Sequence, residues 1–329
     1  MSGTLVVIGA GSWGTAMALV AHAAGFRARL WARREEQAEA LKRDRENRAY
    51  LPGVPFPAGL EIGTDFDGAD RIICAVPTQH VRAAVGPLKS RIRPGTPVLS
   101  LSKGIEIGSL ARPSEILESV LNAPRVTVLT GPSHAEEVAR GLPTVVVAAS
   151  RDESEARKWQ EALSSPSLRL YTGDDPVGAE LGGALKNVIA IAAGIADGLG
   201  LGDNAKAALV TRGIVEMARL GTALGARRTT FFGISGIGDL ITSCTSRHGR
   251  NLRVGREVAA GKKAADVLKG MVAEGVWTCT AARGLGKKHN LDLPITEEVC
   301  KILHEGKAPM EGLKTLMTRM PKSEAQDLG

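Results

Sequence analysis

The sequence predicts an α/β domain followed by an all-helical domain, and three observations lead to this expectation. Short apolar runs of strand length alternate with helical patterns through the first half of the chain. A glycine-rich turn joins the first of these runs to a helix. From about residue 178 the strand-like runs nearly disappear, and alanine-rich helical patterns take over. We therefore expect two domains, residues 1–178 and residues 179–329, packed directly against each other because no low-complexity linker separates them.

The first strand, turn and helix form a recognisable unit. Thr4–Ile8 is an apolar run suited to a buried parallel strand, and it leads into GxGxxG at Gly9, Gly11 and Gly14. A helical pattern follows, and 27–34 then has the pattern of a second strand. This order is that of the Rossmann unit, in which the helix N-terminus faces a dinucleotide's phosphates. An ordinary glycine turn is the alternative, and the context favours dinucleotide binding.

The end of the second strand bears on the choice of dinucleotide. A site selective for NAD has an acidic residue there to hold the ribose 2'-hydroxyl, whereas this chain has Arg33 and Arg34. Guanidinium groups suit a 2'-phosphate, so the sequence favours NADPH over NADH. A solvated arginine pair balanced by Glu35 and Glu36 is the alternative interpretation.

Further strands continue the α/β rhythm, and polar or glycine residues follow them. Because open α/β sheets bind ligands at the carboxyl ends of their strands, Pro77, Lys103, Gly131 and Ser133 are candidate site residues. The further strands are expected at 71–77, 97–104, 125–133, 143–150 and 168–173.

Composition and charge narrow the class of protein. Of the 329 residues, 43% are apolar and only 3% aromatic, whereas 39 are glycine, so the core must consist of small aliphatic side chains with close backbone approaches. The net charge of +7 indicates anionic ligands, but positive and negative residues are interspersed. This pattern favours small phosphorylated ligands over nucleic acid.

The cysteines and the apolar segments bear on the compartment. The four cysteines are far apart and form no CxxC pair, so the sequence indicates neither a zinc site nor a disulfide framework. The uncharged stretch 1–26 lacks the basic region that begins a signal peptide, and glycines interrupt it. We expect a cytoplasmic protein with reduced thiols and no membrane span.

Lys186 stands out in the helical half. It lies just off an apolar stripe of three- and four-residue steps from Leu181 to Leu199, with only Glu180 and Asp197 as charged neighbours between Ala179 and Gly202. A lysine that extends its ammonium to solvent is the commoner case. A catalytic lysine would need burial or a neighbouring cation to lower its pKa. Periodicity alone leaves both interpretations open.

Motifs along nearly the whole chain resemble those of the NAD(P)-dependent glycerol-3-phosphate dehydrogenases. The run "GALKNVIA" at 183–190, continuing to Asn204, resembles their signature over more than twenty positions. The other similar motifs, in chain order, are "GAGSWGTA", "AVPTQ", "SKGIE", "GPSHAEEVA", "GIGDLITSC", "GRN" and "VAEGVWT".

The resemblance implies a fold and an activity. The fold is a Rossmann-type dinucleotide-binding domain followed by an all-α C-terminal domain of the 6-phosphogluconate dehydrogenase C-terminal type. The activity is reversible hydride transfer between NAD(P)H and dihydroxyacetone phosphate to give sn-glycerol 3-phosphate, which supplies glycerophospholipid synthesis. It also implies a homodimer and no resident metal.

The resemblance also implies roles for individual residues. Lys186 would exchange the proton, and Lys103 would be a second cation that helps to lower the pKa of Lys186. Asn187 and Asp239 would position the lysine and the substrate oxygens. Arg250 and Asn251 would hold the phosphate. The remaining implied substrate residues are Gly131, Ser133 and Gly249, and the implied cofactor residues are Gly9, Gly11, Ser12, Trp13, Gly14, Arg33, Arg34, Tyr50, Lys103, Ala135, Arg250, Val272 and Glu274.

Two positions depart from the family pattern, and each single residue has a structural alternative. His134 stands where the family often has an aromatic residue, and Gly249 where it often has a hydroxyl. Taken singly, Lys103 could merely end a strand, Asp239 could cap a helix, and Arg250 could belong to a solvated basic face. Only their joint occurrence favours a site.

Two other functions stay open at this point. One is another β-hydroxy acid or ketone reductase with the same architecture, which would not require a phosphate grip. The other is a nucleotide-binding regulator without catalysis, because a fold alone does not establish chemistry.

Overall fold

The chain forms two compact units in the computed structural model, which describes residues 3–121, 126–321, 323 and 324. Unit 1 comprises Met1–Ser102 and Arg112–Pro176, and unit 2 comprises Lys103–Ala111 and Val177–Gly329. The segment 103–111 belongs to unit 2, although its place in the sequence lies among the strands, because Ile105 is buried in the helical core. Lys103 is thereby in the same unit as Lys186.

Unit 1 is a Rossmann-type α/β unit, as predicted. Its described residues form an eight-stranded sheet in the order β10-β9-β8-β7-β6-β1-β2-β5, and a separate hairpin of β3 and β4. All neighbouring strands of the sheet are parallel except β8 and β9, which are antiparallel. The strands are β1 (Thr4–Ile8), β2 (Arg27–Trp31), β3 (Glu46–Asn47), β4 (Leu51–Pro55), β5 (Glu61–Gly63), β6 (Arg71–Cys74), β7 (Val98–Ser100), β8 (Val126–Thr130), β9 (Thr144–Ala149) and β10 (Leu168–Gly173).

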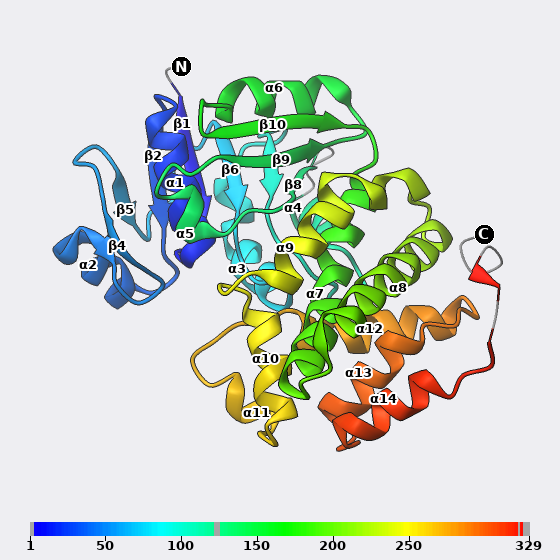
Figure 1. The fold of residues 1–329 in the computed structure, drawn as a ribbon. Helices are drawn as coiled ribbons and strands as arrows, with labels where there is room; N and C mark the ends of the chain where they lie inside the picture. The colour runs from blue at the N-terminus through cyan, green and yellow to red at the C-terminus, as the bar shows by residue number, and fades with distance from the viewer. Residues whose placement is uncertain (1–2, 122–125, 322, 325–329) are drawn as a thin grey trace. The chain divides into compact units, whose positions relative to one another are not determined.

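The helices of unit 1 follow the alternation that the sequence predicted. In Figure 1, α6 runs beside β10 and β9, against which it packs. The carboxyl end of β1 lies between those of β2 and β6, where the strand order reverses and where such sheets bind ligands. The α-helices are α1 (Ser12–Ala23), α2 (Glu35–Asp44), α3 (Val81–Val85), α4 (Pro113–Leu121), α5 (Ala135–Val138) and α6 (Glu153–Leu163).

Each expected strand contains an observed strand: β1 and β10 have the predicted bounds, and the other five observed strands are shorter than predicted. Arg125, the first residue of one expected strand, lies outside the described residues. The sequence analysis did not predict β5 or the β3–β4 hairpin, because runs of two to five residues that contain Gly53 or Gly63 carry little strand signal.

Unit 2 is all-helical in its described residues, as predicted. Figure 1 shows α12, α13 and α14 packed in succession in this unit. The α-helices are α7 (Pro176–Gly198), α8 (Gly202–Ala223), α9 (Asp239–Thr245), α10 (Arg250–Ala259), α11 (Ala264–Val267), α12 (Gly275–Lys288), α13 (Pro294–His304) and α14 (Pro309–Met317), with short turns of other helix types at Arg228–Phe232 and Ile234–Gly238.

The central helix of unit 2 is α7. By length and composition it could cross a membrane, but its apolar 18-residue window is 100% buried inside the structure. Leu181, Leu185 and Val188 of the predicted stripe are part of the unit 2 core. The apolar length of α7 is therefore accounted for by burial between other helices of the unit.

Two glycines let α7 and α10 approach backbone to backbone. A Cβ atom on Gly194 would lie 2.1 Å from the Leu252 carbonyl oxygen, and one on Gly255 would lie 2.1 Å from that of Ile191. Any larger residue at either position would force the helices apart. This crossing sets where the first residues of α10 lie relative to α7.

A buried carboxylate fixes the start of α13. Glu216 of α8 is 5% exposed and accepts hydrogen bonds from the amides of Ile295 (2.6 Å) and Thr296 (3.1 Å), and from the Thr296 hydroxyl (3.1 Å). It thereby caps a helix from a distant element. Burial raises the pKa of Glu216 to about 7.

We expect Gly194→Ala to lower the free energy of unfolding of unit 2 by about 1–3 kcal/mol, because the new methyl group has no space against Leu252. Urea denaturation followed by circular dichroism measures the change. Gly284→Ala is the matched control, because Gly284 lies within α12 of the same unit and a Cβ atom there would be 3.8 Å from the nearest atom, in Leu110, so the variant should not lower the free energy of unfolding. Equal stability of the two variants would contradict the close crossing.

Candidate active site

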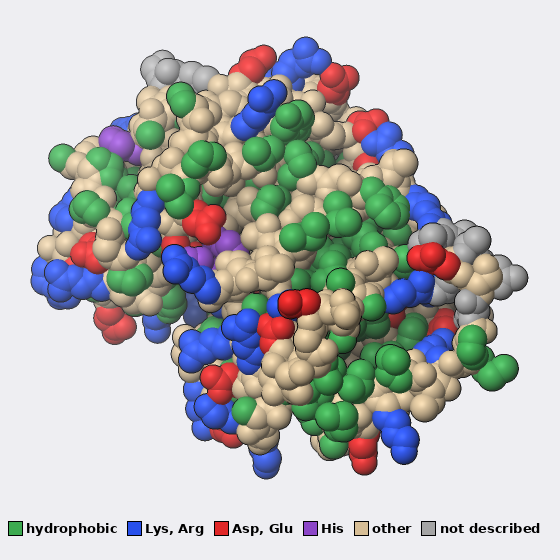
Figure 2. All heavy atoms as spheres, viewed as in Figure 1, with side chains coloured by type: hydrophobic (Ala, Val, Ile, Leu, Met, Phe, Trp, Pro, Cys, Tyr) green, Lys and Arg blue, Asp and Glu red, His purple; other side chains and the backbone are tan. Residues whose placement is uncertain are grey.

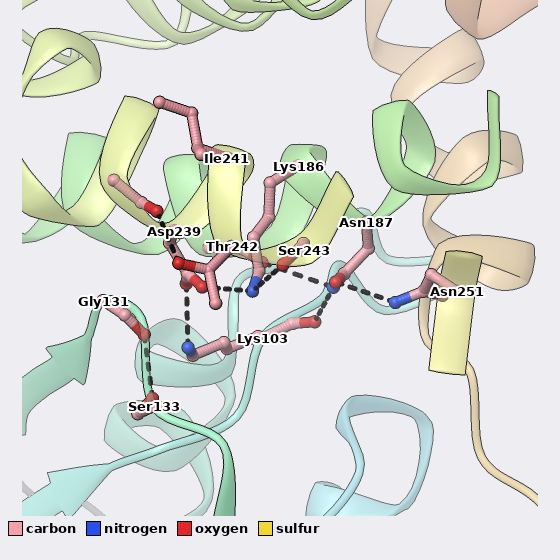
Figure 3. Close-up of polar contacts among 12 residues, drawn as sticks. Lys103, Gly131, Ser133, Lys186, Asn187, Asp239, Ile241, Thr242, Ser243 and Asn251 are labelled. Atoms are coloured by element: carbon pink, nitrogen blue, oxygen red, sulfur yellow. Dashed lines mark hydrogen bonds and ion pairs between the residues drawn. The ribbon is translucent and has the colours of Figure 1, made fainter. Parts of the chain in front are cut away.

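Lys186 is buried on α7, with 7% of its surface exposed. Its ammonium donates hydrogen bonds to Oδ1 of Asp239 and to the Ser243 hydroxyl, the latter at 2.7 Å. Figure 3 shows Lys186 pointing toward these two residues of α9. The lysine therefore does not extend to solvent, and the alternative interpretation of a solvated side chain is wrong.

Asp239 is the first residue of α9 and is 1% exposed. Its second oxygen, Oδ2, accepts a hydrogen bond from Lys103 Nζ at 2.8 Å, with the Lys103 side chain 18% exposed. Two lysines thus share one carboxylate, as Figure 3 shows. The three side chains together carry one net positive charge when all are ionised.

These groups alter one another's protonation. Burial, together with the charge of Lys103, lowers the pKa of Lys186 to about 8, against the opposing attraction of Asp239. Burial alone would raise the pKa of Asp239, but its attraction to Lys103 and Lys186 outweighs burial, and the pKa is lowered. A carboxylate and a lysine that releases its proton near neutral pH therefore lie in contact.

Asn187 and Asn251 connect this centre to two other segments. Asn187 Nδ2 donates to the carbonyl oxygens of Lys103 (3.1 Å) and Gly183 (3.3 Å). Asn251 Nδ2 donates to Asn187 Oδ1 at 2.9 Å, and the Gly275 amide donates to Asn251 Oδ1 at 3.0 Å. The side chain of Asn187 thus holds the Lys103 backbone. The side chain of Asn251 joins α7 to the start of α12.

Arg250 is the first residue of α10, and its side chain is exposed. The residue before it, Gly249, caps the helix without a side-chain hydrogen bond, so the N-terminal amides of α10 are open to an anion. A Cβ atom on Gly249 would lie 3.1 Å from the carbonyl oxygens of Ser243 and Ser246, so a side chain there would fit tightly. Figure 2 shows Lys and Arg side chains gathered over the surface of α10 and α11, interspersed with acidic ones.

In unit 1, the glycine turn has the geometry that a dinucleotide requires. Gly9 has φ +110°, a conformation that favours glycine, and a Cβ atom on Gly14 would lie 1.8 Å from the Gly9 carbonyl oxygen. Around Gly11 there is open space. Helix α1 begins at Ser12 without a side-chain cap, so its first amides are available to a phosphate.

Other residues of unit 1 surround this turn. The Ala10 carbonyl oxygen accepts hydrogen bonds from Gln37 Nε2 (3.0 Å) and Asn47 Nδ2 (3.1 Å), which hold the turn in place. Trp13 Nε1 is buried and has no hydrogen-bond acceptor among the described residues. These features fit a nicotinamide dinucleotide, whose pyrophosphate would need the open amides and whose oxygens could accept from Trp13.

The remaining predicted residues are distributed over both units. In unit 1, Arg33 and Arg34 are exposed beyond the end of β2, Tyr50 is 48% exposed, and Ala135 is buried in a cluster with Ala16 of α1. Gly131 has φ +132° after β8, and its carbonyl oxygen accepts from the Ser133 hydroxyl at 2.8 Å. In unit 2, Val272 and Glu274 lie just before α12 and are partly buried.

The sequence analysis did not single out Ser243, which contacts the Lys186 ammonium. A signal was available, because Ser243 lies four residues after Asp239, and residues at that spacing share one face of a helix.

Comparisons with known proteins agree along the whole chain. Family models described as NAD-dependent glycerol-3-phosphate dehydrogenase N-terminus and C-terminus match residues 4–156 and 175–314. Glycerol-3-phosphate dehydrogenase (NAD(P)+) of Moorella thermoacetica is 47% identical, and the alignment covers 99% of each chain.

Solved structures give the same result. The crystal structure of glycerol-3-phosphate dehydrogenase from Coxiella burnetii matches with a TM-score of 0.93 and 35% identity, covering 97% of this chain and 99% of that one. The enzyme from Saccharomyces cerevisiae matches at 0.81 with 28% identity, covering 97% and 100%. A ketopantoate reductase from Ralstonia eutropha, at 15% identity and a TM-score of 0.61, shares the fold alone.

The buried lysine leads to a prediction about stability and pH. The folded chain releases the Lys186 proton near pH 8, whereas the unfolded chain keeps it to about the usual value of 10.5. Between these values the unfolded state binds more protons, so stability rises with pH. The free energy of unfolding of the wild type, minus that of Lys186→Met, should increase by about 3 kcal/mol from pH 8 to pH 10.5.

Urea denaturation at a series of pH values measures this difference. Lys288→Met is the matched control, because it removes an exposed lysine of the same unit. If the difference for Lys186→Met changes with pH no more than that for Lys288→Met, a lowered pKa of Lys186 is contradicted.

Proposed function

Since this chain belongs to the NAD-dependent glycerol-3-phosphate dehydrogenase family of oxidoreductases, we propose that it interconverts dihydroxyacetone phosphate and sn-glycerol 3-phosphate. The observation that carries this proposal is the buried Lys186 ammonium, held by an Asp239 carboxylate that Lys103 shares. The cellular role would be to supply glycerol 3-phosphate for glycerophospholipid synthesis. Family resemblance also supports a cytoplasmic homodimer.

Lys186 is the group that exchanges the proton. The bound nicotinamide supplies or accepts the hydride at the substrate C2 carbon. In reduction, the Lys186 ammonium gives a proton to the oxygen on C2, and in oxidation the neutral amine takes it back. A pKa of about 8 keeps both forms accessible near neutral pH. Asp239 and Ser243 hold the nitrogen through hydrogen bonds, which fixes the direction of its remaining N–H bond.

Lys103 stabilises the negative charge that develops on the oxygen. With Lys186 and Asp239 it forms a centre of net positive charge, and burial strengthens the attraction of that centre for an alkoxide. Asn187 positions Lys103 by holding its backbone carbonyl. Gly131 and Ser133 are proposed to contact the substrate, as the family pattern implies.

The substrate phosphate binds at the start of α10. The Arg250 guanidinium and the uncapped amides after Gly249 are both suited to phosphate oxygens. Asn251 contributes to phosphate binding by positioning the start of α10, because its side chain is hydrogen-bonded to both Asn187 and Gly275.

The dinucleotide binds to the glycine turn of unit 1, and NADPH is proposed as the preferred form. Exposed Arg33 and Arg34 follow the second strand, where a 2'-phosphate would lie. The family pattern assigns further cofactor contacts to Ser12, Trp13, Tyr50, Lys103, Ala135, Arg250, Val272 and Glu274.

The deciding experiment follows nicotinamide absorbance with purified protein and dihydroxyacetone phosphate, comparing NADPH with NADH. We expect oxidation of both, faster at low concentration with NADPH. Lys186→Met should lower kcat by about 10²- to 10⁴-fold, because it removes the proton donor. Lys288→Met is the control and should keep wild-type turnover. No oxidation of either cofactor by the wild type, or full turnover of Lys186→Met, would refute the proposal.

Recognition of the substrate phosphate distinguishes this activity from that of a general ketone reductase of the same fold. Arg250→Ala should raise KM for dihydroxyacetone phosphate by about 10- to 100-fold, because a charge-assisted hydrogen bond is lost. Arg253→Ala, which removes an exposed arginine of the same helix, is the matched control and should change KM little. Equal wild-type activity toward phosphate-free dihydroxyacetone, together with an unchanged KM in Arg250→Ala, would favour the ketone reductase.

A further inference from the structure

Three metal-ligand side chains meet in unit 2 on helices that do not carry the Lys186 centre. Cys279 of α12 and Cys300 and His304 of α13 each offer one ligand atom, and these atoms lie within 4.8 Å of one another. Helices α12 and α13 pack side by side, as Figure 1 shows. Cys300 and His304 are four residues apart on α13 and so project from the same face.

The spacing of these atoms suits a tetrahedral zinc-type ion. With bonds of about 2.3 Å to sulfur and about 2.0 Å to nitrogen, a tetrahedral site separates sulfur from nitrogen by about 3.5 Å and two sulfurs by about 3.8 Å. Cys279 Sγ lies 3.5 Å from His304 Nε2. The Val276 carbonyl oxygen lies 3.2 Å from Cys279 Sγ and 2.9 Å from His304 Nε2, a position from which it could supply a fourth ligand.

The charged side chains around these three residues permit a cation to bind among them. Arg283 lies close enough to interact with Cys300, but it is paired with Glu305 at 2.5 Å and with Glu297 at 3.8 Å. The thiolate is the form that binds metal, so both sulfurs must lose their protons when the cation enters.

Access and rigidity also fit a metal site. Both cysteines are fully buried, whereas His304 is exposed, so the imidazole provides the route from solvent. Glu216 fixes the start of α13, and the Asn251–Gly275 hydrogen bond fixes the start of α12. The ligands therefore lie on two helices that other contacts already hold in position.

We propose that Cys279, Cys300 and His304 bind one thiophilic divalent cation of the zinc type. Two protons leave the sulfurs as one doubly charged cation enters, so the net charge of the cluster stays the same. His304 Nε2–H now donates a hydrogen bond to the Val276 carbonyl oxygen; on metal binding the ring takes the tautomer that is protonated at Nδ1, so that Nε2 can bind the metal. The ion joins α12 to α13 one helical turn from Gly275, which contacts Asn251 of the candidate active site. The inference does not depend on the proposed activity.

Cobalt binding tests this proposal on the full-length, reduced and chelator-treated protein. Co²⁺ should give thiolate-to-cobalt charge-transfer absorption that saturates at one equivalent, and Zn²⁺ should displace it. His304→Ala should raise the Kd for Co²⁺ by at least about tenfold. Removing a residue that only hydrogen-bonds to a metal ligand already lowers metal affinity by about that factor, and His304 is proposed as a ligand itself. Because His304 is exposed, this variant should fold, which circular dichroism can check.

Cysteine variants complete the design. Cys279→Ser should reduce the charge-transfer intensity by about half, because one of two thiolates is lost, whereas Cys74→Ser, which removes a buried cysteine of unit 1, should change nothing. The proposal is overturned if the wild type shows no stoichiometric band, or if His304→Ala and Cys279→Ser bind as the wild type does. It is also overturned if mass spectrometry finds Cys279 and Cys300 joined in a disulfide that glutathione does not reduce.

Discussion

The Asp239 carboxylate is the group on which the arrangement of unit 2 depends. It is buried, and its two oxygens accept hydrogen bonds from Lys186 of α7 and from Lys103, which is far away in the sequence. A buried carboxylate without a partner is costly, and so is a buried ammonium. The carboxylate therefore holds the segment 103–111 against the helical core, although the strands on both sides of that segment belong to unit 1. The same contact that stabilises this packing brings together the two cations that the proposed chemistry needs.

A second constraint acts at the crossing of α7 and α10. Because Gly194 and Gly255 have no side chains, the two backbones are in contact, and the α10 N-terminus reaches the level of Asn187. The Asn187–Asn251 hydrogen bond follows from that proximity, and Gly275 extends it to the start of α12. The start of α10, proposed to bind the phosphate, and Lys186, proposed to exchange the proton, are thus held in one packed unit. Their relative position depends on backbone contact, which has less freedom than contact between long side chains.

The sequence predicted those features that neighbouring residues determine. The glycine turn, the strands around it and the apolar stripe of α7 each follow from short-range patterns, and the structure confirms them. Family motifs added the joint importance of Lys103, Lys186 and Asp239, but no pattern could show that the first two share the third. The Ser243 contact and the burial of Ile105 with the helices arise from long-range packing. For the same reason cysteine spacing gave no sign that Cys279, Cys300 and His304 meet, because their proximity comes from the packing of α12 on α13.

The ratio of two lysines to one carboxylate explains how a buried ion pair can still exchange a proton. A single lysine in contact with a single buried carboxylate gains strong attraction, which favours the charged form and raises the lysine pKa. Here Lys103 opposes that attraction in two ways: it shares the carboxylate, and its own charge disfavours a second cation nearby. Burial acts in the same direction, so the pKa of Lys186 falls to about 8 while Asp239 remains ionised. Lys186 is thus held firmly by hydrogen bonds without being held permanently in the protonated form. The proposed role, to give a proton and take it back, requires both properties.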